Sequence, residues 1–188
     1  MGCDIHGWVE VKLLDTWYPV IDISLFVHRN YDMFGCLFGV RNYCKFKPIA
    51  ANRGIPDDVS ELVKKEIRSW DIDGHSHTWI TYREIKNINW DEEGDEIDER
   101  VHQYKRLKDG SLKYIGKCLW SSRLDDPEIQ KQLREKGECE VDGIIYRYEK
   151  VKRKDALSRD WEFLFKCMEY LAECYGEENV RLVVWFDN

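Results

Sequence analysis

The chain has 188 residues, of which 43% are hydrophobic and 13% are aromatic. A chain of this length and composition can bury enough apolar surface to offset the entropy that folding removes, so we expect one folded domain over residues 1–188. The 36 acidic and 29 basic side chains give a net charge of −7. That charge repels duplex nucleic acid unless the basic residues cluster on one face, which argues against a general nucleic-acid coat.

The sequence shows no feature of a membrane or secreted protein. No run reaches the roughly 18 apolar residues that a membrane helix needs. Asp4 and His6 stand where a signal peptide has its basic and apolar segments. The seven cysteines form no CxxC pair, and their odd number is typical of reduced thiols. We therefore expect a cytoplasmic protein without a membrane partner, a zinc ribbon or a disulfide scaffold.

The first 70 residues predict a hairpin followed by two helices. Apolar and polar residues alternate over 3–12, and an extended pattern resumes over 17–23, as in two paired strands. Asn30 can cap a short buried helix that runs to about residue 40. The stretch 42–56 has no periodicity and is predicted to be a long ordered loop, whereas residues 57–70 are predicted to form a helix.

The middle of the chain predicts polar connections between short elements. Residues 71–77 are predicted to be a polar loop, and Thr81 can cap a brief helix that ends near residue 88. The acidic run 91–99 is predicted to be a solvated, mobile excursion. The Asp109-Gly110 pair predicts the turn of a second hairpin between residues 104 and 115.

The last third of the chain contains the clearest periodic pattern. Residues 127–136 and 157–175 are predicted to be helices, each closed by a glycine, and residues 143–151 are predicted to form a strand. The apolar run 180–186 is typical of a central strand buried on both faces. Together the elements predict an α+β fold, with a mainly antiparallel sheet and helices packed on it in a single domain.

Residues of unusual chemistry are concentrated in the first 80 positions. On a strand, Asp4 and His6 project from the same face, where a hydrogen bond between them would fix the imidazole tautomer. The spacing of His75 and His77, with Asp73 two residues ahead, suits a zinc or manganese site. Three interpretations remain open for these side chains: structural hydrogen bonds, catalytic or ligand-binding roles, and metal ligation by Asp4, His6, His75 and His77.

Three arginines near the ends of loops and helices indicate a site for an anion: Arg29, Arg41 and Arg53. A guanidinium makes paired contacts with phosphate or carboxylate, and an imidazole can act as acid or base near neutral pH. Asp32, near a predicted helix N-terminus, would repel an anion unless an arginine or a metal neutralises it. The nucleophile and phosphate motifs GxSxG, Walker A and GxGxxG do not occur.

Four motifs follow one another along the chain: MGCDIH at 1–6, RNYDMF at 29–34, RGIPDDVS at 53–60 and DGHSHTW at 73–79. With these motifs in this order, the chain resembles the small phage and bacterial proteins that open with MGCDIH. The resemblance extends over nearly the whole chain. Thr78 stands where that family usually has serine. The resemblance implies that one site is formed by these residues: Asp4, His6, Arg29, Asp32, Arg41, Arg53, His75 and His77.

These features lead to one functional hypothesis and two alternatives. The first is a phage-type accessory protein that binds a small phosphate-bearing, nucleotide-like molecule, with or without hydrolysing it, and so blunts a host nucleotide signal. His6, His75 and His77 would be its catalytic residues, the arginines would hold phosphate, and Trp79 would stack on a base. The alternatives are a phosphoesterase or nuclease that uses a divalent metal, and a non-catalytic module that binds another protein. The sequence does not decide between enzyme and binding protein, and it leaves the oligomeric state open.

Overall fold

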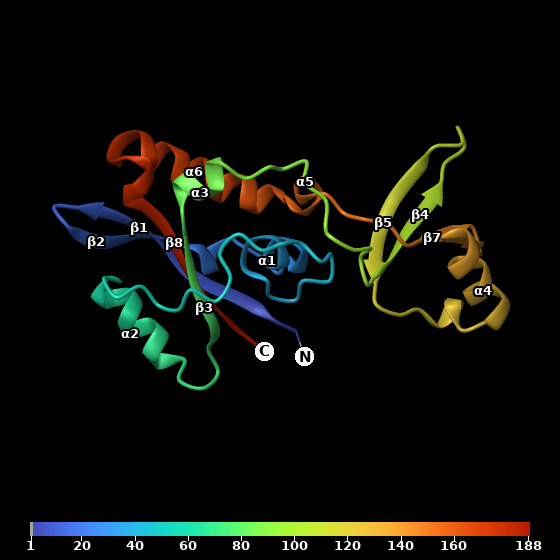
Figure 1. The fold of residues 1–188 in the computed structure, drawn as a ribbon, viewed down its shortest axis with the longest axis horizontal. Helices are drawn as coiled ribbons and strands as arrows, with labels where there is room; N and C mark the ends of the chain where they lie inside the picture. Colours follow the sequence, from blue (N-terminus) through green and yellow to red (C-terminus); the bar gives the residue numbers. More distant parts are fainter. Residues whose placement is uncertain (1) are drawn as a thin grey trace.

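The apolar run near the C-terminus forms the centre of the larger of two antiparallel sheets. The computed structural model describes residues 2–188 and places β8 (Val180–Asp187) between β1 (Asp4–Leu13) and β3 (His75–Thr81), with β2 (Thr16–Asp22) outside β1 (Figure 1). Both neighbours of β8 run antiparallel to it. Residues 180–186 are all buried, so the prediction of a central strand covered on both faces is confirmed.

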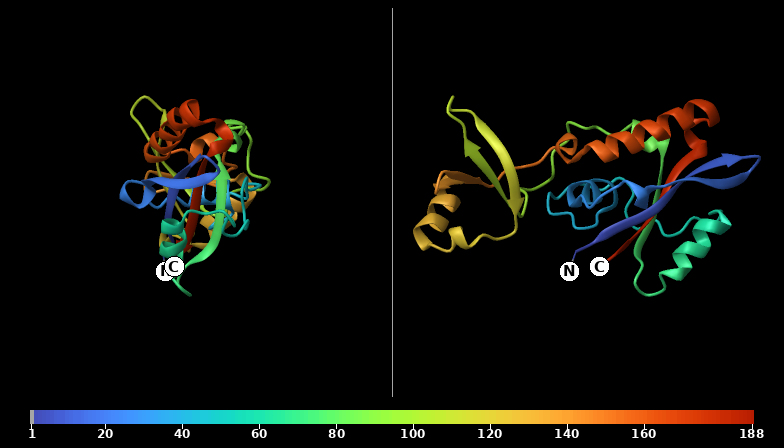
Figure 2. Two further views of the ribbon diagram at one scale, coloured as in Figure 1. Left: turned by 90° about the vertical axis from the view of Figure 1, so that its left-hand side faces the viewer. Right: turned by 180° about the vertical axis from the view of Figure 1, so that it is seen from behind.

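Alternate residues of β8 contact helices on opposite faces of this sheet. Leu182, Val184 and Phe186 belong to the main core with α1 (Tyr31–Phe38) and α6 (Arg159–Tyr175). Val183 and Trp185 pack instead with α2 (Glu61–Ser69). Figures 1 and 2 show α6 and α2 on either side of the sheet. The sheet is therefore the middle layer of three, as its two-sided apolar pattern requires.

Local signals place most helix boundaries. The Asn30 side chain accepts the N–H of Met33 and starts α1, and a capping box between Thr81 and Glu84 starts α3 (Tyr82–Lys86). The helix predicted over 57–70 is shorter in the structure, where α2 begins at Glu61. Just before it, the backbone N–H of Ser60 donates to the buried carboxylate of Glu10. The remaining short elements are α5 (Arg153–Ala156) and the 3₁₀ turns Ile23–Leu25, Ser122–Leu124 and Glu177–Asn179.

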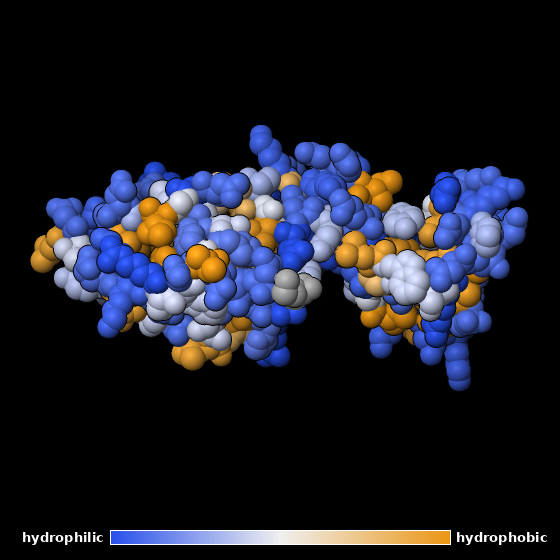
Figure 3. Space-filling view, turned by 90° about the horizontal axis from the view of Figure 1, so that it is seen from below, coloured by the Kyte–Doolittle hydropathy of each residue, from blue (hydrophilic) through white to orange (hydrophobic). Residues whose placement is uncertain are grey.

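The second sheet forms a smaller lobe at one end of the molecule. Its strand order is β5 (Leu112–Cys118), β4 (Val101–Arg106), β7 (Ile144–Arg147) and β6 (Glu138–Val141), and α4 (Pro127–Lys136) packs on it. The Asp109-Gly110 hairpin and α4 lie where the sequence places them, whereas β6 was not predicted and β7 is shorter than the predicted strand. Figures 2 and 3 show that the molecule narrows between this lobe and the larger one.

Two antiparallel segments connect the lobes, and one of them is the acidic run 91–99. Its form differs from the predicted solvated excursion, because the N–H of Gly94 donates to Val151 and the N–H of Asp98 donates to Glu149 on the other connecting segment. The Asp98 side chain is buried. The run is therefore held by hydrogen bonds to the other connecting segment, and several of its carboxylates are exposed.

The predicted fold class is confirmed: the chain is a single α+β domain with two four-stranded antiparallel sheets and six helices over residues 2–188. None of the described helices is both long and apolar enough to span a membrane.

Candidate functional site

A polar cleft of about 460 Å³ lies beside the start of β3, where the larger sheet meets the loop after α1. We call it the Arg41 cleft. Its apolar lining consists of Phe38, Val40, Pro48 and Ala51. Its polar lining comes from four separate parts of the chain and consists of Arg41, Asn42, Asn52, His75, Ser76 and Asn188. No aspartate or glutamate side chain lines the cleft, so its one formal side-chain charge is the positive charge of Arg41.

The backbone around the Arg41 cleft is strained at three positions. Arg41, Asn52 and Ser76 have φ angles of 51°, 54° and 52°, in the left-handed region that favours glycine. Such conformations cost of order 1 to 3 kcal/mol each and cluster at functional sites, because the surrounding structure must hold them in place. Their concentration around one cleft marks it as the best candidate site in the larger lobe.

Arg41 and His75 give the cleft its binding chemistry. The Arg41 Nη2 atom donates to the neutral Oδ1 of Asn188 at 2.9 Å, and no ion pair within residues 2–188 involves Arg41. His75 Nδ1 lies 2.9 Å from Ser76 Oγ, whereas its Nε2 is buried without a hydrogen-bond partner. A buried polar atom without a partner costs about 1 to 3 kcal/mol, which a bound ligand can recover. The cleft therefore offers a cation to an anion, and His75 in its lining has a buried Nε2 atom that makes no hydrogen bond.

The bulge at Ser76 separates the two histidines of β3. His75 pairs with Phe186 of β8, and the register then shifts before Thr78 pairs with Val184. Because of this extra residue, the His75 ring stacks on Phe186 at 6.2 Å, on the α1 side of the sheet. His77 turns to the α2 side. The predicted polar loop 71–77 is therefore wrong at its end, because its last three residues belong to β3, and the two rings lie on opposite faces of the sheet.

His6 shares the α2 side of the sheet with His77. Its ring lies 4.1 Å from the Trp70 ring, and its Nε2 lies 3.6 Å from Asp187 Oδ1. A Cβ atom built on Gly74 would lie 3.0 Å from Trp70 Cβ and 3.7 Å from His77 Nε2, so Trp70 borders both histidines. Burial lowers the pKa of His77, and the nearby His75 lowers it further. The structure groups His6 with His77 and leaves His75 on the other face.

Two of the predicted anion-binding arginines are already paired with carboxylates. Arg29 makes two hydrogen bonds to Asp4, at 2.9 and 2.7 Å, and these bonds hold the pKa of Asp4 below its ordinary value. Asp4 therefore pairs with Arg29 rather than with His6. Arg53 makes two hydrogen bonds to Glu84, at 2.9 and 2.6 Å, and lies over the Trp79 ring at 5.1 Å. Arg53 and Trp79 therefore have structural roles beside β3, because the guanidinium is paired with Glu84 and covers the indole ring.

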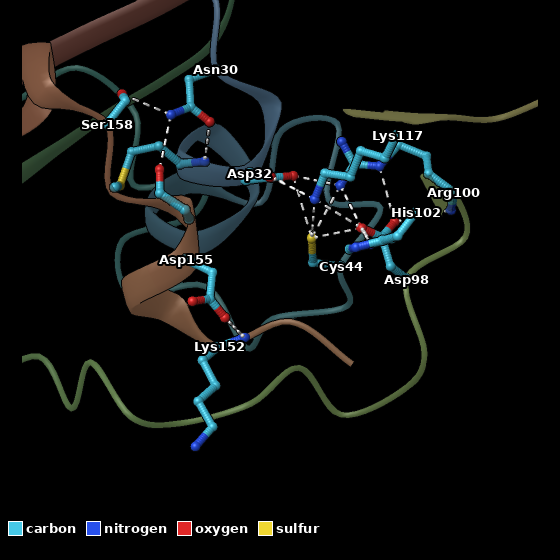
Figure 4. A network of polar contacts seen from close by, with 12 residues as sticks. Asn30, Asp32, Cys44, Asp98, Arg100, His102, Lys117, Lys152, Asp155 and Ser158 are labelled. Atoms are coloured by element: carbon cyan, nitrogen blue, oxygen red, sulfur yellow. Dashed lines mark hydrogen bonds and ion pairs between the residues drawn. The ribbon is translucent and has the colours of Figure 1, made fainter. Parts of the chain in front are cut away.

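Asp32 belongs to a buried polar cluster at the junction of the lobes (Figure 4). We call it the junction cluster, and it consists of Asp32, Cys44, Asp98, Arg100, His102 and Lys117. Arg100 bridges Asp32 and Asp98, and Lys117 Nζ lies 2.6 Å from Asp32 and 3.0 Å from Asp98. Burial alone would raise the pKa of Asp98, but hydrogen bonds from His102 and Arg100 hold it far below its usual range.

The junction cluster is satisfied internally and does not suit a metal ion. Asp32, Cys44 and Asp98 present ligand atoms within 4.8 Å of one another, the only such group of three found in residues 2–188. The ammonium of Lys117 lies against both carboxylates. Burial also raises the pKa of the Cys44 thiol, which keeps it protonated, whereas a metal needs the thiolate. The four residues predicted as metal ligands, Asp4, His6, His75 and His77, do not form such a group.

Sequence reasoning missed most of the junction cluster. Its members lie between positions 32 and 117, and no short motif joins them. One available clue was the unequal distribution of charge, since the acidic run 91–99 is followed by the basic stretch that contains Arg100 and Lys117. Comparisons of the chain with models of protein families, with curated proteins and with solved structures gave no match.

Proposed function

We propose that the protein binds a small phosphate-bearing, nucleotide-like molecule in the Arg41 cleft. The observation that carries the proposal is that Arg41, which has no carboxylate partner, lies with His75 in one cleft that lacks acidic side chains. A guanidinium suits phosphate because it is always charged and donates in a fork. The volume of about 460 Å³ lies within the range of small-molecule sites.

The proposal narrows the set of ligand-binding residues that the sequence indicates. Arg41 and His75 would contact phosphate, and the Asn52 amide would bind the sugar or a second phosphate, whereas the Asn42 amide is bonded to the Phe46 backbone through both its nitrogen and its oxygen. Phe38 is the one aromatic residue in the lining, and it is 2% exposed, so the cleft favours recognition of phosphate and ribose over stacking on a base. His75 is the candidate acid or base if the bound molecule is hydrolysed.

Calorimetric titration tests this proposal with cyclic dinucleotides and ADP-ribose, and with inorganic phosphate as the minimal probe. These nucleotides come first because the resemblance to small phage and bacterial proteins, if it holds, would make host nucleotide signals the natural ligands. If Arg41 and His75 contact phosphate, Arg41→Ala and His75→Ala each remove a charge-assisted hydrogen bond of roughly 1.5 to 3 kcal/mol, or about 10- to 150-fold in affinity.

The control is Arg68→Ala, which removes an exposed arginine from α2 and should leave the affinity unchanged. Equal loss of affinity in all three variants would indicate a non-specific charge effect. Absence of binding by the parent protein to every probe would refute the proposal.

A second candidate is a protein-interaction module, and one observation favours it. Leu119 and Trp120 on the smaller lobe are 56% and 67% exposed, and large exposed apolar side chains of this kind are enriched at interfaces. If the parent protein binds no nucleotide, Trp120→Ala should disrupt complexes recovered with the purified protein while leaving its melting temperature unchanged.

A further inference from the structure

Helix α6 has two apolar stripes, and the fold uses only one of them. The first stripe packs into the main core and consists of Trp161, Leu164, Met168 and Ala172. The second lies on the outer side of the helix and consists of Phe163, Cys167, Tyr170 and Cys174. Phe163 and Tyr170 are 56% and 66% exposed, and Figures 1 and 2 show α6 at the surface of the larger lobe. A helix packed on a sheet needs apolar residues only on the face that it buries, so folding does not account for the second stripe.

The second stripe, which we call the outer stripe, continues onto the segment before α1. The Phe26 ring contacts Phe163 edge to face, with the ring centroids 5.4 Å apart. The preceding residue, Leu25, is 79% exposed. Large apolar side chains that are exposed side by side in this way mark a surface that binds another molecule.

The spacing of the outer stripe is that of a helix packed along a second helix. Its residues follow one another after four, three and four positions, as in the a and d positions of a coiled coil. Large and small side chains alternate along it, in the order Phe, Cys, Tyr and Cys.

This alternation fits a second copy of α6 that runs antiparallel, with a two-fold axis between Cys167 and Tyr170. Phe163 then lies opposite the partner's Cys174, and Tyr170 lies opposite the partner's Cys167. Each ring meets a small side chain, as close packing between helices requires. A parallel pair would place rings opposite rings and cysteines opposite cysteines.

Two charged residues beside the outer stripe favour the same arrangement. Lys166 and Glu173 lie on one flank of the stripe, both are exposed, and neither has an ion-pair partner within residues 2–188. Seven positions separate them, or about 10.5 Å along the helix, so they do not pair with each other. In the antiparallel pair, Lys166 faces the partner's Glu173, and the two-fold axis makes this contact twice.

We infer that the outer stripe of α6 binds a second copy of the chain, as an antiparallel pair of α6 helices related by a two-fold axis. The stripe identifies this occupant because it complements itself both in side-chain size and in charge. One helix from each copy forms a small interface, so we expect a weak dimer with a dissociation constant on the order of 10⁻⁵ M. The outer stripe shares no residue with the Arg41 cleft, and the inference does not depend on the proposed function.

Sedimentation velocity from about 1 to 500 μM protein tests the inference, because this range spans the expected dissociation constant. Lys166→Glu and Glu173→Lys each replace two attractive contacts by two repulsive ones and should weaken the dimer at least about 10-fold. The double variant Lys166→Glu/Glu173→Lys restores both contacts and should return to within about 3-fold of the parent protein. An equal mixture of the two single variants should form a heterodimer, because each copy then carries the charges that the other lacks.

The apolar part of the interface is tested by Phe163→Ala/Tyr170→Ala, which should weaken the dimer at least about 10-fold because buried aromatic side chains dominate the binding energy of interfaces. The matched control for the charge variants is Lys65→Glu, at an exposed position of α2, and it should change the affinity less than about 2-fold. A monomer at every concentration overturns the inference. A dimer that Lys166→Glu weakens no more than Lys65→Glu does also overturns it and assigns the contact to another surface. If the single variants dissociate but do not associate when mixed, the antiparallel pairing is wrong.

Discussion

The Arg41 cleft and the junction cluster are built from similar side chains and have opposite properties. In the junction cluster each carboxylate accepts from several cations, and Asp98 alone is contacted by Arg100, His102 and Lys117. In the Arg41 cleft the arginine has a neutral partner and His75 Nε2 has none. Charged residues buried together therefore do not by themselves define a binding site. The cleft differs from the junction cluster in that its arginine has no carboxylate partner and its histidine has a ring nitrogen without a hydrogen bond.

The positions of the two regions fit this difference. The junction cluster joins residues of α1, the connecting acidic run and the smaller sheet, so it links the two lobes. The Arg41 cleft lies at one end of the larger sheet, where the strained residues Arg41, Asn52 and Ser76 surround it. We interpret the first region as architecture and the second as the site.

The largest expected effect comes from removing a charge from the junction cluster. Asp98→Asn keeps the shape of the side chain but leaves Arg100 and Lys117 with one carboxylate fewer. Breaking a buried ion pair in this way costs about 3 to 5 kcal/mol of the free energy of unfolding. Urea denaturation measures the loss, with Asp15→Asn as the control because the Asp15 side chain is 99% exposed. A loss below about 1 kcal/mol would mean that the cluster tolerates an unpaired cation and that the comparison fails.

Arg53 and Arg41 are expected to differ in their contribution to stability, with effects smaller than that of Asp98. Arg53→Ala removes the paired contact with Glu84 and a bond to the Ile49 carbonyl, so it should cost about 1 to 2 kcal/mol of stability. Arg41→Ala should change stability by less than about 0.5 kcal/mol, since it loses one bond to a neutral side chain. Chemical denaturation of both variants in parallel decides the matter. If Arg41→Ala is the more destabilised variant, Arg41 is a scaffold residue.

The sequence predicts those parts of the fold that local signals specify. The helix at 127–136 is predicted at both ends, because Asp126 caps it, Pro127 occupies its first turn and Gly137 closes it in the left-handed conformation. The central position of β8 follows from its uninterrupted apolar run. The strand at 138–141 was missed because its four residues alternate Glu, Cys, Glu and Val, a pattern too short to distinguish from the end of the preceding helix.

The candidate site was less predictable, because its geometry depends on backbone detail and on long-range partners. The sequence predicts a polar loop over 71–77, whereas His75 and His77 lie in β3, where the bulge at Ser76 places their rings on opposite faces of the sheet. Arg53 appeared free in the sequence, but its partner Glu84 lies 31 positions later. Of the nine residues predicted to bind ligand or act in catalysis, only Arg41 and His75 line the Arg41 cleft.

The pH dependence of stability tests the burial of His77. Burial and the neighbouring His75 lower the pKa of His77 in the folded protein, so the unfolded chain takes up a proton at His77 first as pH falls. The contribution to stability is therefore present above the unfolded-state pKa near 6.5 and is lost as pH falls through the folded pKa. His77→Gln should flatten the loss of stability between pH 7 and 5 in melts, whereas His28→Gln, at an exposed position, should not. Identical profiles for both variants would contradict the assignment.

The smallest expected effect tests the strain at the Arg41 cleft. Ser76 has a φ of 52°, a conformation that costs an L-residue roughly 1 to 2 kcal/mol and that glycine adopts freely. Glycine loses more backbone entropy on folding, which offsets about 0.5 to 1 kcal/mol of this advantage. Ser76→Gly and Ser76→Ala both lose the hydroxyl contact with His75, so their difference isolates the backbone term. Ser76→Gly should be more stable than Ser76→Ala by about 0.5 to 1 kcal/mol in urea denaturation. At Lys65, an exposed position in the interior of α2, the order of the glycine and alanine variants should reverse, because glycine is less stable than alanine in a helix by about 1 kcal/mol. If Ser76→Ala were as stable as Ser76→Gly or more stable, Ser76 would be unstrained, and the bulge would no longer mark this cleft as the site.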